Sequence, residues 1–220
     1  MELMKTYQKA IDSLLEKVRN TQTDNIIKAG NLITEAVLAG GKVYLSEICH
    51  AIQKDLIHRG GGVSIYKEVD LKKEEDMAKL KKGDVLVVSS VSGRTQHVVD
   101  AAWKAMELGV NVIAFTSMEY TKNVEAVHPS GKRLYEFVTL ALDNCAPAAE
   151  AMVEVEGLEP RFAAASGIAS AYIMWNVTAV FVENMMKKGY TPGVFKSINF
   201  PGGDEFNKSF VEKQYDELGW

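Results

Sequence analysis

Hydroxyl side chains gather in one short stretch of the chain, where Ser90, Ser92 and Thr95 fall within six residues. The stretch follows an apolar run and leads into an apolar-periodic segment, so we expect it to join a buried strand to a helix, whose first turn offers unpaired N–H groups and a positive dipole end. Gly93 permits a tight backbone path, and Arg94 can pair with an oxyanion. The alternative is that Ser92 and Thr95 only cap the helix, but capping needs a single hydroxyl. We therefore predict that this turn binds an anion such as a phosphate or a sulfonate.

A carboxylate and an imidazole follow another short apolar run, Val43–Leu45, at Glu47 and His50. A carboxylate and an imidazole three residues apart can serve as the base and the proton donor of a proton-transfer reaction. In an open parallel sheet, ligands bind beyond the carboxyl ends of the strands, where both residues are expected. We therefore predict that Glu47 and His50 are catalytic and that the adjacent Ser46 contacts substrate. The alternative is that Glu47 only favours a helix N-terminus while His50 is structural.

Three further residues are candidates on weaker patterns. Lys132 lies at an expected helix start and is predicted to be catalytic. Asn144 ends an apolar run, where either recognition of a sugar hydroxyl or turn formation is consistent with its position. Glu205 follows a glycine pair in the tail and is predicted either to cap a short helix or to reach an active site, including that of a neighbouring subunit.

The spacing of histidines and cysteines indicates no metal site, and the glycine run at residues 60–62 does not open a helix as a dinucleotide-binding loop does. We therefore expect no cofactor, although spacing alone does not decide metal dependence. With a net charge of −4 and no basic stripe, the chain is not expected to bind nucleic acid. Two cysteines without CxxC spacing and the absence of a signal-peptide pattern favour a cytoplasmic location.

The elements that must position these residues alternate along the chain. Helical patterns are expected over residues 1–18 and 25–39, and over Ile52–Arg59, Lys72–Lys82, His97–Leu108 and Phe206–Leu218. Strands are expected at Val43–Leu45, Val63–Tyr66, Val85–Val88, Val110–Phe115 and Val138–Leu142. This alternation predicts right-handed βαβ units around a parallel sheet that two helix layers cover. The length of 220 residues favours a single domain, 1–220.

The segment Phe162–Val182 carries no charge and is long enough to span a bilayer. Its many small residues, with Asn176 and Thr178 among them, favour a buried helix and no membrane association. One face of this helix, here called the apolar seam, is apolar at a spacing of four and three residues and is expected to need a second helix or a partner subunit as cover: Ile168, Tyr172, Trp175, Ala179, Val182 and Met186.

The six residues Ser90-Val91-Ser92-Gly93-Arg94-Thr95 resemble the S-x-S-G-x-T phosphate loop of the SIS (sugar isomerase) domain family. The resemblance extends over the strand–turn–helix–strand run Gly83–Thr116. The later segments HPSGKRLYEF, LDNCAPAAEA and NFPGGDEFN are similar to a SIS subgroup often labelled phosphoheptose-isomerase-like or uncharacterised. One segment departs from the family, because YLSEICHAIQKD has no glycine where SIS proteins usually have a glycine-rich turn after the first strand.

The resemblance implies a flavodoxin-like, three-layer α-β-α sandwich with a five-stranded parallel sheet, extended here by N-terminal helices. It also implies a homodimer or homotetramer with sites near subunit contacts, in which Ser90, Ser92, Thr95 and the backbone of Val91 hold the phosphate. The function expected is aldose–ketose isomerisation of a small anionic sugar with a terminal phosphate or a phosphate-like sulfonate, without a cofactor. The alternatives are a non-catalytic sugar-phosphate-binding module and an amino-sugar-phosphate lyase or etherase.

Overall fold

A five-stranded parallel sheet forms the centre of the computed structural model, which describes residues 1–50 and 52–220. Its strand order is β2-β1-β3-β4-β5. The strands are β1 (Val43–Leu45), β2 (Tyr66–Glu68), β3 (Val85–Ser89), β4 (Asn111–Thr116) and β5 (Leu140–Asp143). Because Leu45 of β1 pairs in parallel register with Val87 of β3, the turns after these two strands leave the same edge of the sheet side by side. The predicted five-stranded parallel sheet is therefore confirmed.

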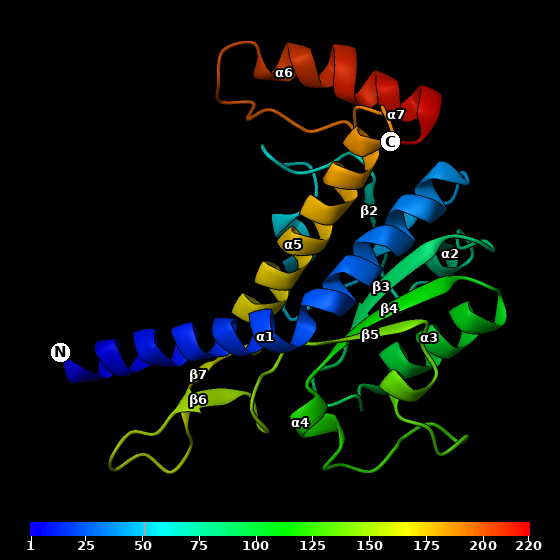
Figure 1. Cartoon of the computed structure of the whole chain (residues 1–220). Coiled ribbons are helices and arrows are strands. Elements are labelled where there is room, and N and C mark those ends of the chain that lie inside the picture. Colours follow the sequence, from blue (N-terminus) through cyan, green and yellow to red (C-terminus); the bar gives the residue numbers. More distant parts are fainter. Residues whose placement is uncertain (51) are drawn as a thin grey trace.

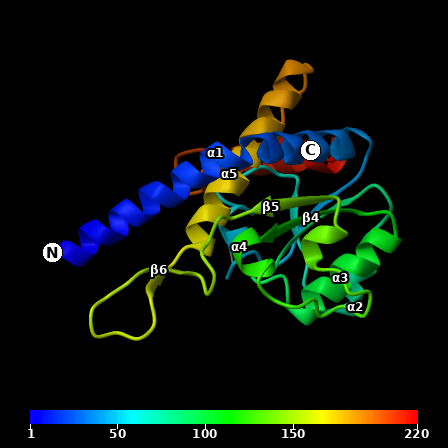
Figure 2. The ribbon, with the colours of Figure 1, turned by 60° about the horizontal axis from the view of Figure 1, so that its bottom comes forward.

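Helices cover both faces of this sheet, as predicted. In Figure 2, α1 (Glu2–Leu38) lies above the sheet, and α3 (Gln96–Glu107) and α2 (Glu74–Met77) lie below it. Alternate residues of β3 point into two separate cores, because Val85 and Val87 pack with α1 and α5 (Ser166–Lys187) while Leu86 and Val88 pack with α3. This burial of both faces explains why the central strands β1 and β3 are almost entirely apolar.

The N-terminal region is a single helix, where two were predicted. No glycine or proline interrupts residues 2–29, so α1 continues through the polar stretch at residues 21–24. The Gln22 side chain is buried there, and its Oε1 accepts a hydrogen bond from Asp143 N at 3.1 Å. The first turns of α1 project beyond the sheet (Figure 1), and buried residues of the helix begin at Leu14.

Two predicted helices are much shorter in the structure. The segment Lys72–Lys82 contains only the single turn α2, because side chains hold the rest as a loop. The Asp70 side chain accepts a hydrogen bond from Lys72 N at 3.0 Å, and the Asp76 side chain accepts one from Asp70 N at 3.0 Å. The segment Ile52–Arg59 contains only the 3₁₀ turn η1 (Ile52–Asp55). The predicted strand Val63–Tyr66 begins at Tyr66, and Val63 forms an isolated antiparallel bridge with Val194.

The long uncharged segment begins with a strand rather than a helix. β7 (Phe162–Ala164) pairs antiparallel with β6 (Ala151–Val153) in a hairpin, and α5 starts only at Ser166. α5 packs closely on α1 at Gly30, where an added Cβ would lie 2.5 Å from Val180 Cβ. Among the described residues, no helix combines the length and apolar character that a bilayer span requires.

The apolar seam lies on the less buried side of α5. Ile168 and Met186 at its two ends are 39% and 55% exposed, whereas the opposite face of α5 is buried at Ile173 and Phe181. α1 therefore covers a different face from the one expected, and a partner subunit over the apolar seam stays a prediction. The tail is helical throughout residues 203–218, as α6 (Gly203–Phe206), the π-helical η3 (Asn207–Glu212) and α7 (Lys213–Leu218).

Two short elements complete the fold between β4 and β5. They are α4 (Met118–Thr121), which follows β4 directly, and the 3₁₀ turn η2 (Leu134–Glu136). α4 lies against the turn that joins β3 to α3, since Thr121 meets Gly93 there.

Candidate functional site

The turn between β3 and α3, residues 90–95, is here called the anion turn. It is closed by the Gly93 N–H, which donates to Ser90 O at 2.9 Å, and by Ser90 Oγ, which accepts from Thr95 N at 3.1 Å and donates to Thr95 Oγ1 at 3.0 Å. Gly93 has a φ of 69°, and a Cβ at this position would lie 2.3 Å from Thr121 Oγ1. Only glycine fits both the conformation and the space.

Backbone donors are left free in this turn. Within residues 1–50 and 52–220, the N–H groups of Val91, Ser92, Gln96 and His97 donate to no protein acceptor. Thr95 is the N-cap residue of α3, yet its side chain makes no capping hydrogen bond. Helix capping therefore does not account for the hydroxyls, and the combination of free amides, hydroxyls and a helix N-terminus suits an oxyanion.

A cleft of about 1050 Å³ opens where β1, β2 and β3 end. It brings together six residues predicted to form the site: Glu47, His50, Ser90, Val91, Ser92 and Thr95. Arg94 is exposed and does not line the cleft. The two turns that the sequence singled out separately thus form two walls of one cavity.

The turn after β1, residues 46–50, is here called the β1 turn, and it has no glycine. Two of its residues nevertheless adopt the left-handed conformation, Cys49 with a φ of 39° and His50 with a φ of 65°. Such a conformation costs an L-residue about 1 kcal/mol. Glu47 and His50 are exposed to the cleft, whereas Ser46 is buried and donates from Oγ to Val87 O at 2.9 Å. Ser46 therefore ties β1 to β3 rather than facing a ligand.

The floor of the cleft contains a thiol that the sequence did not indicate. Cys49 Sγ lies 3.0 Å from Ser89 Oγ and 3.1 Å from Ser170 Oγ. Burial raises the pKa of the Cys49 thiol above its ordinary value, and the negative charge of Glu150 raises the pKa further, so the thiol stays neutral. Asn144 is fully buried behind this floor, with Nδ2 4.0 Å from Cys49 Sγ and Oδ1 accepting from Ala146 N at 3.1 Å.

Four carboxylates of the cleft were also missed: Asp70 and Asp76 in the loop after β2, and Glu68 and Glu150. Glu68 ends β2 and accepts a hydrogen bond from Gln53 Nε2 at 3.3 Å. Glu150 follows β5 in the stretch AAEA, accepts a hydrogen bond from Ser166 Oγ, and has a φ of 69°. No residue spacing could have identified Glu68 or Glu150, because strand β2 was expected to end at Tyr66 and AAEA has the composition of an ordinary loop.

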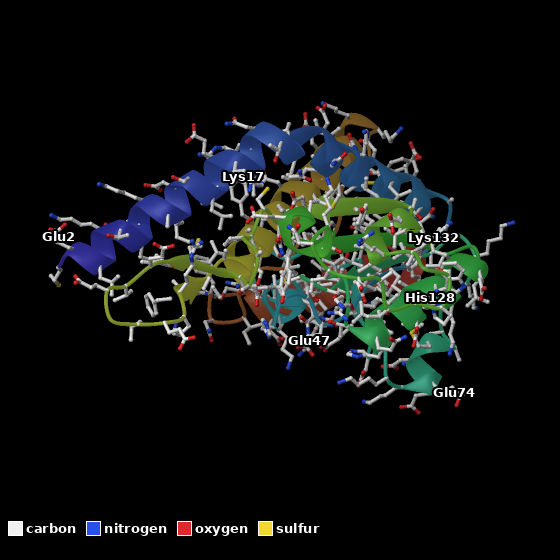
Figure 3. The ribbon with its side chains drawn as sticks, turned by 90° about the horizontal axis from the view of Figure 1, so that it is seen from below. Glu2, Lys17, Glu47, Glu74, His128 and Lys132 are labelled. Atoms are coloured by element: carbon white, nitrogen blue, oxygen red, sulfur yellow. The ribbon has the colours of Figure 1, made fainter. Side chains whose placement is uncertain are left out.

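Lys132 and Glu205 do not reach this cleft. Lys132 is exposed on a loop whose His128 stacks on Trp103 of α3 at 4.3 Å between ring centroids, and Figure 3 shows both loop residues apart from Glu47. Glu205 is exposed on α6 in the tail and is not among the residues that line the cleft of its own chain. Within one chain, Glu47 and His50 are therefore the two predicted catalytic residues that line the cleft.

The described part of the chain contains no group of three His, Cys, Asp or Glu side chains arranged to hold a metal ion. The site is built instead from hydroxyls, backbone amides, carboxylates and imidazoles. These groups can bind an anion and transfer protons.

Comparison with known proteins agrees with this architecture. Residues 65–117 match the SIS domain, and the sheet together with the anion turn defines a SIS-domain protein. A UPF0309 protein of Oceanobacillus iheyensis is 30% identical over 243 aligned positions, which cover 99% of this chain and 99% of the relative. The chain belongs to the UPF0309 family.

Two solved structures share the fold at low sequence identity. A putative phosphosugar isomerase involved in capsule formation from Bacteroides fragilis has a TM-score of 0.57 and 20% identity, and the match covers 86% of this chain and 93% of that one. The Vibrio vulnificus NanR protein complexed with ManNAc-6P has a TM-score of 0.53 and 13% identity, and the match covers 99% of this chain and 70% of that one.

Proposed function

We propose that this protein is an aldose–ketose isomerase for a sugar that carries a terminal phosphate or sulfonate. The observation that carries the proposal is the position of Glu47 and His50 in the same cleft as the anion turn. A ligand held by its anionic end at residues 90–95 then has its carbon chain directed across the cavity toward the β1 turn. Proximity of this kind turns proton transfer into a step within one complex.

The anionic end is bound by the free donors of the anion turn. The N–H groups of Val91 and Ser92 have no acceptor within the described residues, and the hydroxyls of Ser92 and Thr95 line the same cavity. Hydrogen bonds to a charged acceptor are stronger than those between neutral groups. The similarity to the NanR protein complexed with ManNAc-6P supports a phosphorylated sugar as the class of ligand.

Proton transfer is assigned to the β1 turn. The Glu47 carboxylate takes the proton from C2 of the aldose, while the His50 imidazolium donates a proton to O1, and the product of this step is an enediol. Glu47 then returns its proton to C1. Both side chains are exposed to the cleft, so a bound sugar can contact them.

A second candidate is a sugar-phosphate sensor without catalysis. The likeness to NanR over 99% of this chain favours it as the alternative. A sensor needs only the anion turn, whereas an isomerase also needs the titratable groups opposite. An amino-sugar-phosphate lyase or etherase would begin with the same removal of the C2 proton.

The test begins with a thermal-shift screen of sugar phosphates and sulfonated sugars, because a ligand that binds only the folded state raises the melting temperature. Each hit is then incubated with enzyme in heavy water and followed by NMR. We expect deuterium at the carbon that gains the proton and conversion to the isomeric sugar. Binding without exchange would show a sensor, and exchange with elimination would show a lyase.

Variants of the two walls complete this test. Ser92→Ala and Thr95→Ala should each raise KM about 10-fold, because a hydrogen bond to a charged group contributes about 1.5 kcal/mol. Glu47→Gln should lower kcat at least about 100-fold with KM little changed. Ser130→Ala, at an exposed serine in the loop of His128 outside the cleft, is the matched control. Unchanged turnover in Glu47→Gln would remove Glu47 as the base.

A further inference from the structure

Glu150 lies at the base of the β6–β7 hairpin, where the chain leaves the sheet and later returns. The polypeptide leaves the sheet after β5, reaches Glu150, runs out along the β6–β7 hairpin, and returns at Ala165, whose N–H donates to Glu150 O at 3.0 Å. The next residue, Ser166, begins α5, a helix of 22 residues. The Glu150 carboxylate therefore lies beside the first residue of this helix.

The two oxygens of this carboxylate have different surroundings. One oxygen, Oε1, accepts a hydrogen bond from Ser166 Oγ. Within residues 1–50 and 52–220, the other oxygen, Oε2, has no hydrogen-bond partner in the protein, and the residue lines the cleft. Glu150 also acts electrostatically on the Cys49 thiol at the cleft floor. The carboxylate thus has one held oxygen and one available to a ligand.

The backbone around Glu150 is held in an unfavourable conformation. Ala149 has a φ of 62° and Glu150 a φ of 69°, so two consecutive residues with side chains occupy the left-handed region. Neither position is filled by glycine, which would adopt this conformation without strain. Strain of this kind persists where the surrounding structure and a function require it. Here its effect is to direct a carboxylate into the cleft from the side of α5.

The proposed isomerisation contains a second proton transfer, at O2. When the enediol becomes a ketose, the O2 hydroxyl must lose a proton as the C2–O2 double bond forms. Glu47 is protonated at that stage and delivers its proton to C1, so it cannot accept a second one at the same time. Two other groups can accept it: His50, which has given its proton to O1, and Glu150, which lines the same cleft.

We propose that Glu150 is a catalytic residue that accepts the O2 proton as the enediol collapses to the ketose, an assignment that rests on the proposed isomerase function. Electrons of the O2–H bond form the C2–O2 double bond, the C1–C2 double bond takes the proton from Glu47, and Glu150 becomes neutral. Glu150 then releases its proton to water, and His50, which gave its proton to O1, takes one from water. All three side chains are restored, and no other reactant is consumed.

The test separates proton exchange from product formation. In Glu150→Gln, Glu47 and His50 still form the enediol, so deuterium from heavy water continues to enter C2 of the unconverted aldose, while kcat for the ketose falls at least about 100-fold. In Glu47→Gln, both exchange and conversion are lost. Glu159→Gln, an exposed glutamate at the end of the same hairpin loop, is the control and should retain wild-type rates.

A second variant guards against a folding defect. Ser166→Ala leaves the Glu150 carboxylate in place but removes the hydrogen bond that holds its Oε1. Its kcat should fall with KM little changed, and its melting temperature should stay close to that of wild type. A Glu150→Gln enzyme whose kcat is within threefold of wild type would overturn the role of Glu150 but not the proposed isomerase function. A wild-type protein that binds sugar phosphates but neither exchanges nor converts them would overturn the proposed function and this role with it.

Discussion

The two turns that form the walls of the cleft differ in the residues that occupy their left-handed backbone positions. The anion turn has a glycine at its one left-handed position and presents backbone N–H groups. The β1 turn has no glycine and places Cys49 and His50 in left-handed conformations. Both turns leave neighbouring strands, in register at Leu45 and Val87, so the difference lies in the residues and not in their position in the sheet.

In the proposed reaction, the two walls have different roles. Any phosphate or sulfonate can be recognised by amides and hydroxyls, and the relaxed turn supplies them without strain. Proton transfer needs particular side chains, and glycine cannot provide them. The β1 turn therefore retains side chains at a cost of about 1 kcal/mol for each left-handed residue.

The largest effect is expected from breaking the anion turn. Gly93→Ala should lower the free energy of unfolding by about 2–4 kcal/mol, because the new Cβ is strained at this φ and meets Thr121 Oγ1. Urea unfolding measures the loss. Gly83→Ala is the matched control, since Gly83 also has a positive φ but no atom lies within 4 Å of its added Cβ, and the loss there should be about 1 kcal/mol. Equal losses in the two variants would show that Thr121 does not constrain the turn.

In the β1 turn, a substitution is expected to raise the free energy of unfolding instead of lowering it. His50→Gly should raise the free energy of unfolding by about 0.5–1 kcal/mol, because glycine relieves the left-handed strain by more than it adds to the entropy of the unfolded chain. The same variant should lose turnover. His58→Gly provides the comparison, because His58 has a φ of 50° but lies outside the cleft, so its gain in stability should leave kcat unchanged. A destabilised His50→Gly protein with full activity would contradict both parts.

The smallest effect concerns the Cys49 thiol and appears only at alkaline pH. Because burial raises the pKa of Cys49 above its ordinary value of 9.0, the folded state holds this proton more tightly than the unfolded chain does. The resulting stabilisation is fully present below about pH 9 and is lost as the pH rises through the folded-state pKa. Urea unfolding at pH 7, 9 and 10 should therefore show a steeper decline for wild type than for Cys49→Ala. Parallel declines would show that the thiol does not titrate differently in the two states.

The sequence predicted the parts of this molecule that depend on local patterns. Four of the five predicted apolar runs became strands, and the fifth contributes only Tyr66 to β2, whereas the S-x-S-G-x-T stretch became the turn that was expected, because strand burial and helix initiation are encoded by adjacent residues. The helix predicted at Lys72–Lys82 failed since Asp70 and Asp76 bind backbone N–H groups and hold a loop. Local hydrogen bonds of this kind are not visible in hydrophobic periodicity.

The cleft residues that escaped prediction depend on contacts between distant segments. Glu150 reaches the cavity only because the hairpin returns the chain to Ser166, and Cys49 faces Ser170 across more than a hundred residues of sequence. The burial of Ser46 and Asn144 likewise involves distant partners, Val87 and Cys49. Residue type indicated that these positions were polar, but only the fold determines which of them meet the cavity.

The hydrogen bond between Ala165 N and Glu150 O has a consequence for engineering. It closes a loop whose two ends are adjacent, and the tip at residues 156–161 is exposed to solvent. Foreign sequence such as a fluorophore-attachment tag could therefore be inserted at the tip without separating the ends, since exposed loop tips are where insertions are best tolerated. A reporter placed there would be covalently linked, through a short hairpin, to a residue that lines the cleft.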